Sequence, residues 1–204
     1  CIDCVAGKYV EGTGSALESN CTRCAAGKYS PVVGSTLESN CIDCFVGKYI
    51  DVPGSDSSED CIDCVAGKYV EVTGSFLESN CTMCEPGKFS SVVGSTLARN
   101  CIECGVGKYI DVPGSNSTED CIDCVAGKYA EGNGSSVESH CLQCAPGLYS
   151  TVVGSNTSTD CIECVPGRYV VQTGSDEASD CIECVVGRYV DVPGSNSSSD
   201  CIGC

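Results

Sequence analysis

The cysteines are the residues of this chain whose spacing could support chemistry. The 204 residues contain 22 cysteines, which form a Cys-x-x-Cys motif at residues 1–4 and again every twenty residues, eleven times in all. Such closely spaced cysteines can form structural disulfides, hold zinc as thiolates, or exchange electrons through a reducible disulfide. The rest of the sequence has to discriminate among these three kinds of chemistry.

Zinc and redox chemistry both fit the sequence poorly. The spacing Cys-x2-Cys-x16-Cys-x2-Cys lies within the range of four-cysteine zinc sites. However, eleven motifs cannot all pair into such sites, and each tetrathiolate zinc would add negative charge to an already acidic chain. A redox motif of thioredoxin type needs βαβ surroundings, which this sequence lacks. Disulfides are therefore favoured, and no metal or other cofactor is expected.

The composition is typical of a small fold that disulfides stabilise. The chain has no Trp, three Phe and one Met, so each repeat can bury one ring and a few aliphatic side chains. That burial is too small to outweigh about 1–2 kcal/mol of backbone entropy per residue. A disulfide that closes a loop of this size contributes roughly 3 kcal/mol. So many disulfides persist only outside the reducing cytosol, and we therefore expect an extracellular protein.

Two disulfide patterns are compatible with the spacing, which alone does not fix the connectivity. Bridges inside each Cys-x-x-Cys motif would use every cysteine, but they would form tight rings that are easily reduced. A ladder from the second cysteine of one repeat to the first of the next closes ten equal loops and leaves Cys1 and Cys204 without partners in this stretch. We favour the ladder, which pairs consecutive members of the series Cys4, Cys21, Cys24, Cys41, Cys44, Cys61, Cys64, Cys81, Cys84, Cys101, Cys104, Cys121, Cys124, Cys141, Cys144, Cys161, Cys164, Cys181, Cys184 and Cys201.

The cysteines belong to an uninterrupted twenty-residue repeat. Each copy has Gly at position seven, Tyr or Phe at position nine, and Gly-Ser at positions fourteen and fifteen. A short fixed period predicts a repeat array, and we expect one tandem array over residues 1–204. Repeat subtypes also alternate with a sixty-residue period, which reflects either duplication of three repeats at a time or a superhelical turn of three repeats. The ten repeats are residues 1–20, 21–40, 41–60, 61–80, 81–100, 101–120, 121–140, 141–160, 161–180 and 181–200, and residues 201–204 begin an eleventh.

Within a repeat, the sequence predicts little regular structure. Residues 7–11 favour a strand of three or four residues, and Gly14 and Ser15 supply a hairpin turn whose backbone the serine hydroxyl can bond. Gly7 avoids a clash with the bridge or with the turn. The ring of Tyr9 packs across the adjacent disulfide and the backbone of the next repeat, with stacking on carbohydrate as an alternative role. No segment has helical periodicity. We therefore expect a small disulfide-rich solenoid of short β-hairpins and irregular loops, with little or no helix, shaped as an elongated rod whose repeats contact mainly their neighbours.

The charge and hydropathy of the chain limit its partners. A formal net charge of −17 argues against nucleic acid and anionic membrane surfaces, and no apolar run is long enough to insert into a membrane. The surface should be rich in Ser, Thr and Asn and poor in large apolar side chains. Acidic clusters such as Asp51, Asp56, Glu59 and Asp60 could hold Ca²⁺ through oxygen ligands, but they lack a recognisable loop spacing and are interpreted as solvated. His140 stands where Asn20 and Asn80 occur and is interpreted as a surface substitution.

Six asparagines match the Asn-x-Ser/Thr acceptor pattern for N-glycosylation. Asn116, Asn156 and Asn196 share position sixteen, in a loop expected to be exposed, and are the favoured sites. Asn133 also matches, whereas Asn20 and Asn80 have Cys at the middle position and are the poorest acceptors. Covalent glycans are therefore expected.

The pattern Cys-x-x-Cys-x-x-Gly-x-Tyr/Phe, followed by a glycine-centred turn, resembles the ephrin-receptor-like cysteine-rich repeat, which is related to growth-factor-receptor modules. Residues 81–89 (CTMCEPGKF) carry this pattern with Pro86 just before the glycine, and Pro146 and Pro166 occupy the same position. The resemblance covers all ten repeats. It implies an extracellular, disulfide-linked rod without enzymatic activity.

Two hypotheses of function follow from the sequence. Ten near-identical repeats in one register favour a structural component of an extracellular, glycosylated filament or surface appendage, in which copies or neighbouring repeats associate head to tail. The alternative is a cysteine-rich stalk or ligand-binding ectodomain of a cell-surface receptor or adhesin. No group of residues resembles a catalytic centre, so we do not expect an enzyme.

Overall fold

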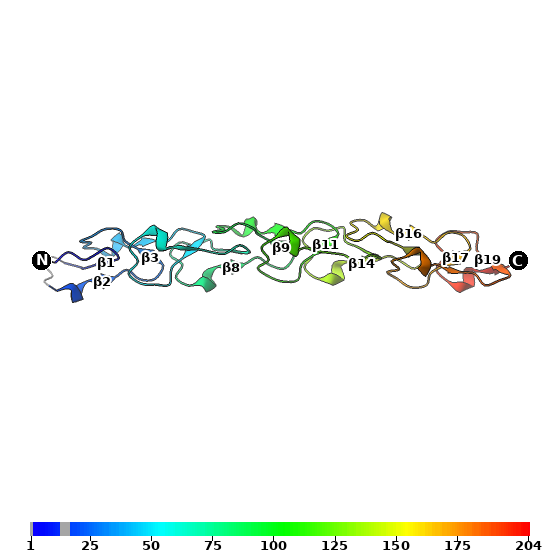
Figure 1. The fold of residues 1–204 in the computed structure, drawn as a ribbon, viewed down its shortest axis with the longest axis horizontal. Coiled ribbons are helices and arrows are strands. Elements are labelled where there is room, and N and C mark those ends of the chain that lie inside the picture. Colours follow the sequence, from blue (N-terminus) through cyan, green and yellow to red (C-terminus); the bar gives the residue numbers. More distant parts are fainter. Residues whose placement is uncertain (1, 13–16) are drawn as a thin grey trace. The chain divides into compact units, whose positions relative to one another are not determined.

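The computed structural model describes residues 2–12 and 17–204, and its backbone divides into two compact units. The first unit comprises Cys1–Glu85, Phe89–Ile102 and Pro113–Ser117, and the second comprises Pro86–Lys88, Glu103–Val112 and Thr118–Cys204. Both units contain the same elements in the same order: a two-residue strand, a three-residue 3₁₀ helix and a second two-residue strand (Figure 1).

These three kinds of element recur at twenty-residue intervals. The leading strands are β1 (Lys8–Tyr9), β3 (Lys28–Tyr29), β5 (Lys48–Tyr49), β7 (Lys68–Tyr69), β9 (Lys88–Phe89), β11 (Lys108–Tyr109), β13 (Lys128–Tyr129), β15 (Leu148–Tyr149), β17 (Arg168–Tyr169) and β19 (Arg188–Tyr189). The 3₁₀ helices are η1 (Glu18–Asn20), η2 (Glu38–Asn40), η3 (Ser58–Asp60), η4 (Glu78–Asn80), η5 (Ala98–Asn100), η6 (Thr118–Asp120), η7 (Glu138–His140), η8 (Ser158–Asp160), η9 (Ala178–Asp180) and η10 (Ser198–Asp200). The returning strands are β2 (Thr22–Arg23), β4 (Ile42–Asp43), β6 (Ile62–Asp63), β8 (Thr82–Met83), β10 (Ile102–Glu103), β12 (Ile122–Asp123), β14 (Leu142–Gln143), β16 (Ile162–Glu163), β18 (Ile182–Glu183) and β20 (Ile202–Gly203).

Each β-hairpin joins two successive repeats. In the hairpin of β5 and β6, Lys48 lies opposite Asp63 and Tyr49 lies opposite Ile62 in an antiparallel register. The expectation of short hairpins is confirmed, but the strands are shorter than expected, and the Gly-Ser pair does not close the hairpin. Ser55 instead forms a parallel bridge with Tyr29 of the preceding repeat. The backbone of the loop therefore pairs with the preceding repeat, and the antiparallel partner of β5 is β6, which follows the end of the loop.

Four backbone hydrogen bonds connect each repeat to the next in a recurring pattern. They involve the backbone at positions four, seven, ten, fourteen and fifteen, so the backbone of the irregular loops is hydrogen-bonded as well as that of the strands. Between the third and fourth repeats, the N–H groups of Gly47, Ile50, Cys64 and Gly74 donate to the carbonyl oxygens of Val70, Ser75, Gly47 and Cys44 at 2.9, 3.1, 2.9 and 2.9 Å, respectively.

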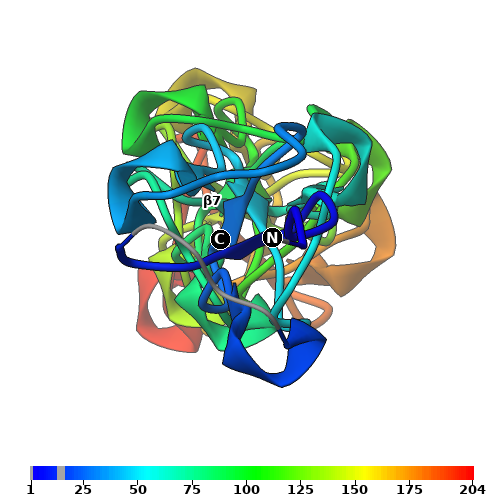
Figure 2. The same cartoon turned by 90° about the vertical axis from the view of Figure 1, so that its left-hand side faces the viewer.

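In several repeats the 3₁₀ helix is capped by the side chain at position twenty. The Asp60 Oδ2 accepts hydrogen bonds from the backbone N–H groups of Asp56 and Ser57 at 3.2 and 3.1 Å. These bonds satisfy donors that a helix of one turn cannot pair internally. Asp180 and Asp200 cap η9 and η10 in the same way. Helices η3, η9 and η10 contain no buried residue. In Figure 2 the 3₁₀ helices of each unit lie at the periphery, while strand β7 lies inside.

The structure confirms the expected fold class of disulfide-linked hairpin repeats. Short 3₁₀ turns are the only helical segments in the part of the chain that the structure describes. None of the described helices has the length and apolar character needed to cross a membrane.

Candidate functional site

The most regular chemical feature of the chain is a ladder of ten disulfides. The bridged Cα atoms are 5.6–5.8 Å apart, and each bridge spans 17 residues of sequence. Cys204 is free and exposed, and Cys1 lies outside the described residues. The structure joins Cys4–Cys21, Cys24–Cys41, Cys44–Cys61, Cys64–Cys81, Cys84–Cys101, Cys104–Cys121, Cys124–Cys141, Cys144–Cys161, Cys164–Cys181 and Cys184–Cys201.

The aromatic ring at position nine covers the bridge of the next repeat. Tyr49 packs against a cluster formed by Cys64, Cys81 and Val70. Cys64 is only 1% exposed there, so an attacking thiolate has little access to the sulfurs. The ring therefore lies across a disulfide, as expected, but the bridge belongs to the next repeat and is not the one beside the ring in sequence. The packing makes the bridges structural rather than exchangeable.

The glycine at position seven is explained by a repeat two places further along the chain. Gly67 has φ +83°, and a Cβ atom there would overlap the backbone carbonyl oxygen of Gly114. Gly47 meets the carbonyl of Gly94 in the same way. The structure therefore gives a different partner from the bridge expected at this position, and it adds a contact two repeats away to the bonds that join immediate neighbours. The close approach of two backbones leaves room only for glycine.

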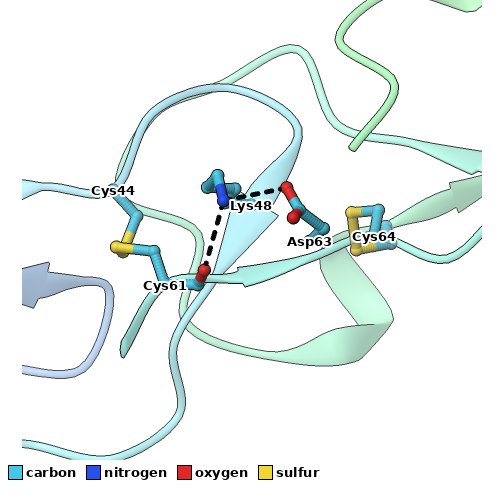
Figure 3. Close-up of polar contacts among 6 residues, drawn as sticks. Cys44, Lys48, Cys61, Asp63 and Cys64 are labelled. Carbon is cyan, nitrogen blue, oxygen red and sulfur yellow. Dashed lines mark hydrogen bonds and ion pairs between the residues drawn. A yellow bond between two sulfur atoms is a disulfide. The ribbon is translucent and has the colours of Figure 1, made fainter. Parts of the chain in front are cut away.

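The basic side chain at position eight finds a carboxylate in one of two places. Figure 3 shows Lys48, whose Nζ lies 3.0 Å from the Asp63 Oδ1 across the hairpin and 3.5 Å from the carbonyl oxygen of Cys61. Where position three of the next repeat is not acidic, the lysine turns to position eighteen of its own repeat. Lys128 reaches Glu138 at 2.9 Å in this way, because the cross-strand residue is Gln143.

These ion pairs have two electrostatic consequences. The hydrogen bond and charge of Lys128 lower the pKa of the Glu138 carboxyl. Near the start of the chain, burial raises the pKa of the Tyr9 hydroxyl, and the negative charges of Glu38 and Glu11 add to that effect. Within the described residues, at least seven of the eleven basic side chains are held in ion pairs, whereas the chain has 28 acidic residues, so the surface keeps an excess of unneutralised carboxylates.

Aliphatic side chains are abundant on the surface, which contradicts the expectation of a surface poor in large apolar residues. Val52 is 60% exposed and Ile62 is 48% exposed. The expectation failed because the buried positions of this fold are mainly the cysteines, the residue at position ten and the serine at position fifteen, with most position-nine rings half-buried. Position two and the loop valines stay outside. Since position two is Ile in most repeats, the repeat itself could have signalled an apolar surface.

Two depressions lie at equivalent places in different repeats. The larger, of about 370 Å³, is lined by Ile50, Val52 and Ile62 together with Asp51, Asp56 and Asp60. The smaller, of about 240 Å³, is lined by Val170, Val171, Gln172, Ser179, Asp180 and Ile182. The sequence predicted that the acidic residues Asp51, Asp56, Glu59 and Asp60 are solvated rather than bound to a cation. Among the described residues, no cluster of three or more His, Cys, Asp or Glu side chains is arranged to hold a metal ion.

The six sequon asparagines occupy two different environments. Asn116, Asn156, Asn196 and Asn133 are exposed in loops that precede the 3₁₀ helices. Asn80 is half-buried, and its Oδ1 accepts hydrogen bonds from the backbone N–H groups of Phe76 and Leu77 at 3.2 and 2.9 Å. Asn20 is exposed and ends η1, at the corresponding position.

His140 has a local structural role that sequence analysis missed. Its Nδ1, in the assigned tautomer, accepts a hydrogen bond from the backbone N–H of Ser136 at 3.4 Å. It thus replaces the Asp and Asn caps of other repeats with a longer bond, at an exposed site. The signal was available in the sequence, since position twenty is Asp or Asn in the other repeats.

Comparison with known proteins identifies a family. The family model described as "Tyrosine-protein kinase ephrin type A/B receptor-like" matches residues 12–61 and 67–121. No curated protein matches the chain.

Proposed function

Since the chain belongs to the tyrosine-protein kinase ephrin type A/B receptor-like family, we propose that it is a cysteine-rich stalk or ligand-binding ectodomain of a cell-surface receptor or adhesin. The family match and the disulfide content both indicate an extracellular domain of receptor type. The family also indicates a non-enzymatic role. The observation that carries the proposal is the family match, which spans repeats with the same ladder of buried bridges.

The expected role of such a segment is to hold binding surfaces at a distance from the cell membrane. Each repeat is tied to the next by one disulfide and a recurring set of backbone bonds, so it resists local collapse. Solvated loops and 3₁₀ turns carry the variable residues, which is where a stalk or ectodomain displays recognition features.

Cell-surface display can be tested with antibodies against the chain on native cells. We expect labelling of intact cells, and loss of that labelling after brief protease treatment of the cell exterior. Labelling that requires permeabilised cells, or recovery of the chain with reduced cysteines, would refute an extracellular receptor-type role.

A filament component is the second candidate function. It is supported by the backbone donors and acceptors between repeats, which recur at the same positions from one repeat to the next and therefore suit the addition of a second copy. Electron microscopy of purified native material distinguishes the two functions. Filaments much longer than one chain would favour the structural role, and single short particles would favour the ectodomain.

Glycans are proposed for the exposed loops in either case. Asn116, Asn156 and Asn196 are exposed at position sixteen, next to hydroxyl residues of the sequon. The side-chain oxygen of Asn80 accepts two backbone hydrogen bonds, and Cys81, which follows it, is bridged to Cys64. Glycopeptide mass spectrometry should find modification at Asn116, Asn156 and Asn196 and none at Asn80. The reverse order of occupancy would contradict this ranking.

A further inference from the structure

We propose that the depression between the third and fourth repeats, here called the Ile50 groove, binds a basic segment of a partner protein that carries alternating cationic and aliphatic side chains. This inference rests on the proposed ectodomain function, because it names the class of partner that such an ectodomain would recognise. The Ile50 groove is defined by Ile50, Asp51, Val52, Asp56, Asp60 and Ile62.

The shape of the Ile50 groove suits side chains of an extended peptide. Its floor is Ile50, which is only 2% exposed, and its walls include Val52 and Ile62, which are 60% and 48% exposed. A volume of about 370 Å³ is at the small end of ligand sites and accommodates a few side chains rather than a large cofactor. Half-exposed aliphatic walls gain free energy when a partner removes them from water.

The charges around the Ile50 groove select a cationic occupant. In the described part of the chain, no hydrogen bond or ion pair engages the carboxylate of Asp51 or Asp56. The nearby Lys48 is already committed to Asp63 and to the carbonyl of Cys61 (Figure 3). Two free carboxylates beside an apolar floor therefore remain for groups brought by a partner.

The same charges argue against other occupants. A second copy of this chain carries a net charge of −17, so its sideways approach to this acidic groove is opposed by repulsion. A metal ion is a poor candidate because Asp60 already uses Oδ2 to accept two backbone N–H groups. Anionic ligands are repelled by the carboxylates. A basic segment with aliphatic side chains complements both the charge and the apolar walls.

The smaller depression in the ninth repeat provides an internal comparison. Val170, Val171 and Ile182 supply similar apolar walls, but Asp180 is the one carboxylate that lines it, and its Oδ2 accepts the N–H groups of Asp176 and Glu177. If charge selects the occupant, this site should bind a basic segment more weakly than the Ile50 groove.

The test uses the full 204-residue chain with its disulfides intact and an end-capped heptapeptide of alternating lysine and valine as the probe. NMR titration should perturb the amides of Asp51, Val52 and Ile62 first, and higher salt should weaken binding. Two control probes replace the lysines by glutamate or the valines by serine. Both should bind at least several-fold more weakly.

Variants built from residues that occur at the same positions elsewhere in the chain keep the fold intact. The double variant Asp51→Thr and Asp56→Thr uses the residues found at Thr151 and Thr36. It should weaken lysine–valine binding about three- to tenfold, as expected for two exposed charge pairs. Ile62→Thr, which copies Thr82, should weaken binding by about two- to fivefold.

The matched control removes two charges away from the Ile50 groove by Glu85→Ala and Glu177→Ser, which copy Ala25 and Ser57. Its affinity should stay within about twofold of the unmodified chain, since distant exposed charges are screened. Equal weakening by both double variants would overturn the groove in favour of general attraction to an acidic chain, as would perturbations spread evenly over all repeats. If the probe leaves the Ile50 groove unperturbed while antibodies still label intact cells, the groove is refuted and the ectodomain function stands. If antibodies label the chain only in permeabilised cells, the ectodomain function is refuted, regardless of the result of the peptide titration.

Discussion

Replacing Gly67 by alanine tests the contact between repeats that are two places apart. The residue has φ +83°, where alanine costs about 1–2 kcal/mol relative to glycine. The new Cβ atom would also overlap the Gly114 carbonyl oxygen, so one backbone must shift. The bonds at risk join the Gly67 N–H to the Ser90 oxygen at 2.7 Å and the Gly114 N–H to the Cys84 oxygen at 2.8 Å. Each is worth about 0.5–1.5 kcal/mol.

The total local destabilisation is therefore about 2–5 kcal/mol, which corresponds to roughly 30- to 4000-fold faster amide exchange at the affected positions. Native-state hydrogen exchange measures this free energy residue by residue. The amides of Gly67, Ser90 and Gly114 should lose protection together, although they belong to three different repeats. The disulfides remain intact, so repeats far from the substitution should keep their protection.

Gly167→Ala is the matched control. Gly167 has φ +89°, but among the described residues no atom beyond its chain neighbours lies within 4 Å of the place that a Cβ would take. Alanine there carries the backbone cost alone, and it should destabilise its surroundings by only about 1–2 kcal/mol. If Gly67→Ala proved no more disruptive than Gly167→Ala, the close approach of the two backbones would not contribute to stability, and our explanation of the glycine at position seven would be refuted.

Three further substitutions test the bridges and the caps. Replacing Cys64 and Cys81 together by serine should cost about 3 kcal/mol and expose the Tyr49 ring, as measured by local hydrogen exchange and tyrosine fluorescence; an unchanged ring environment would contradict its packing on the bridge. The lowered pKa of Glu138 means that its ionised carboxylate stabilises the folded chain. This contribution is fully present above the ordinary pKa of 4.5 and is lost as the pH falls through the lowered value. Glu138→Gln should remove that part of an acid-unfolding profile, and identical profiles for the two proteins would refute the ion pair. Replacing His140 by asparagine should strengthen the cap by about 0.5–1 kcal/mol and protect the Ser136 amide, whereas faster exchange there would show that the imidazole is the better acceptor.

Much of the scaffold could be predicted from the sequence because the repeat is strict. Evenly spaced cysteines allow few regular disulfide patterns. In the ladder, the bridge between Cys44 and Cys61 closes a loop of the same length as the bridges before and after it. Each repeat has one aromatic ring and few other large apolar groups besides its disulfide, so the composition also predicted that a ring such as Tyr49 packs on a bridge. Local reasoning succeeded for the disulfides, whose partners lie within one period of the chain.

The features that could not be predicted depend on which repeat supplies the partner. The Gly-Ser pair reads locally as a hairpin turn, but Ser55 bonds a strand of the preceding repeat, and the hairpin closes beyond it. The reason for Gly67 lies two repeats away, and a periodic sequence gives no indication of that distance. The Ile50 groove likewise combines positions ten to sixteen of one repeat with position two of the next, so it exists only after the chain has folded.

The most direct test of the ladder, on which the extracellular function depends, is disulfide mapping of the native chain without reductant. The intact mass should fall short of the fully reduced form by two hydrogens for each of the ten bridges. Proteolytic peptides should link Cys24 to Cys41 and Cys44 to Cys61. Peptides in which Cys41 is bridged to Cys44 inside one motif, or a mass that matches free thiols, would contradict the ladder and the function built on it.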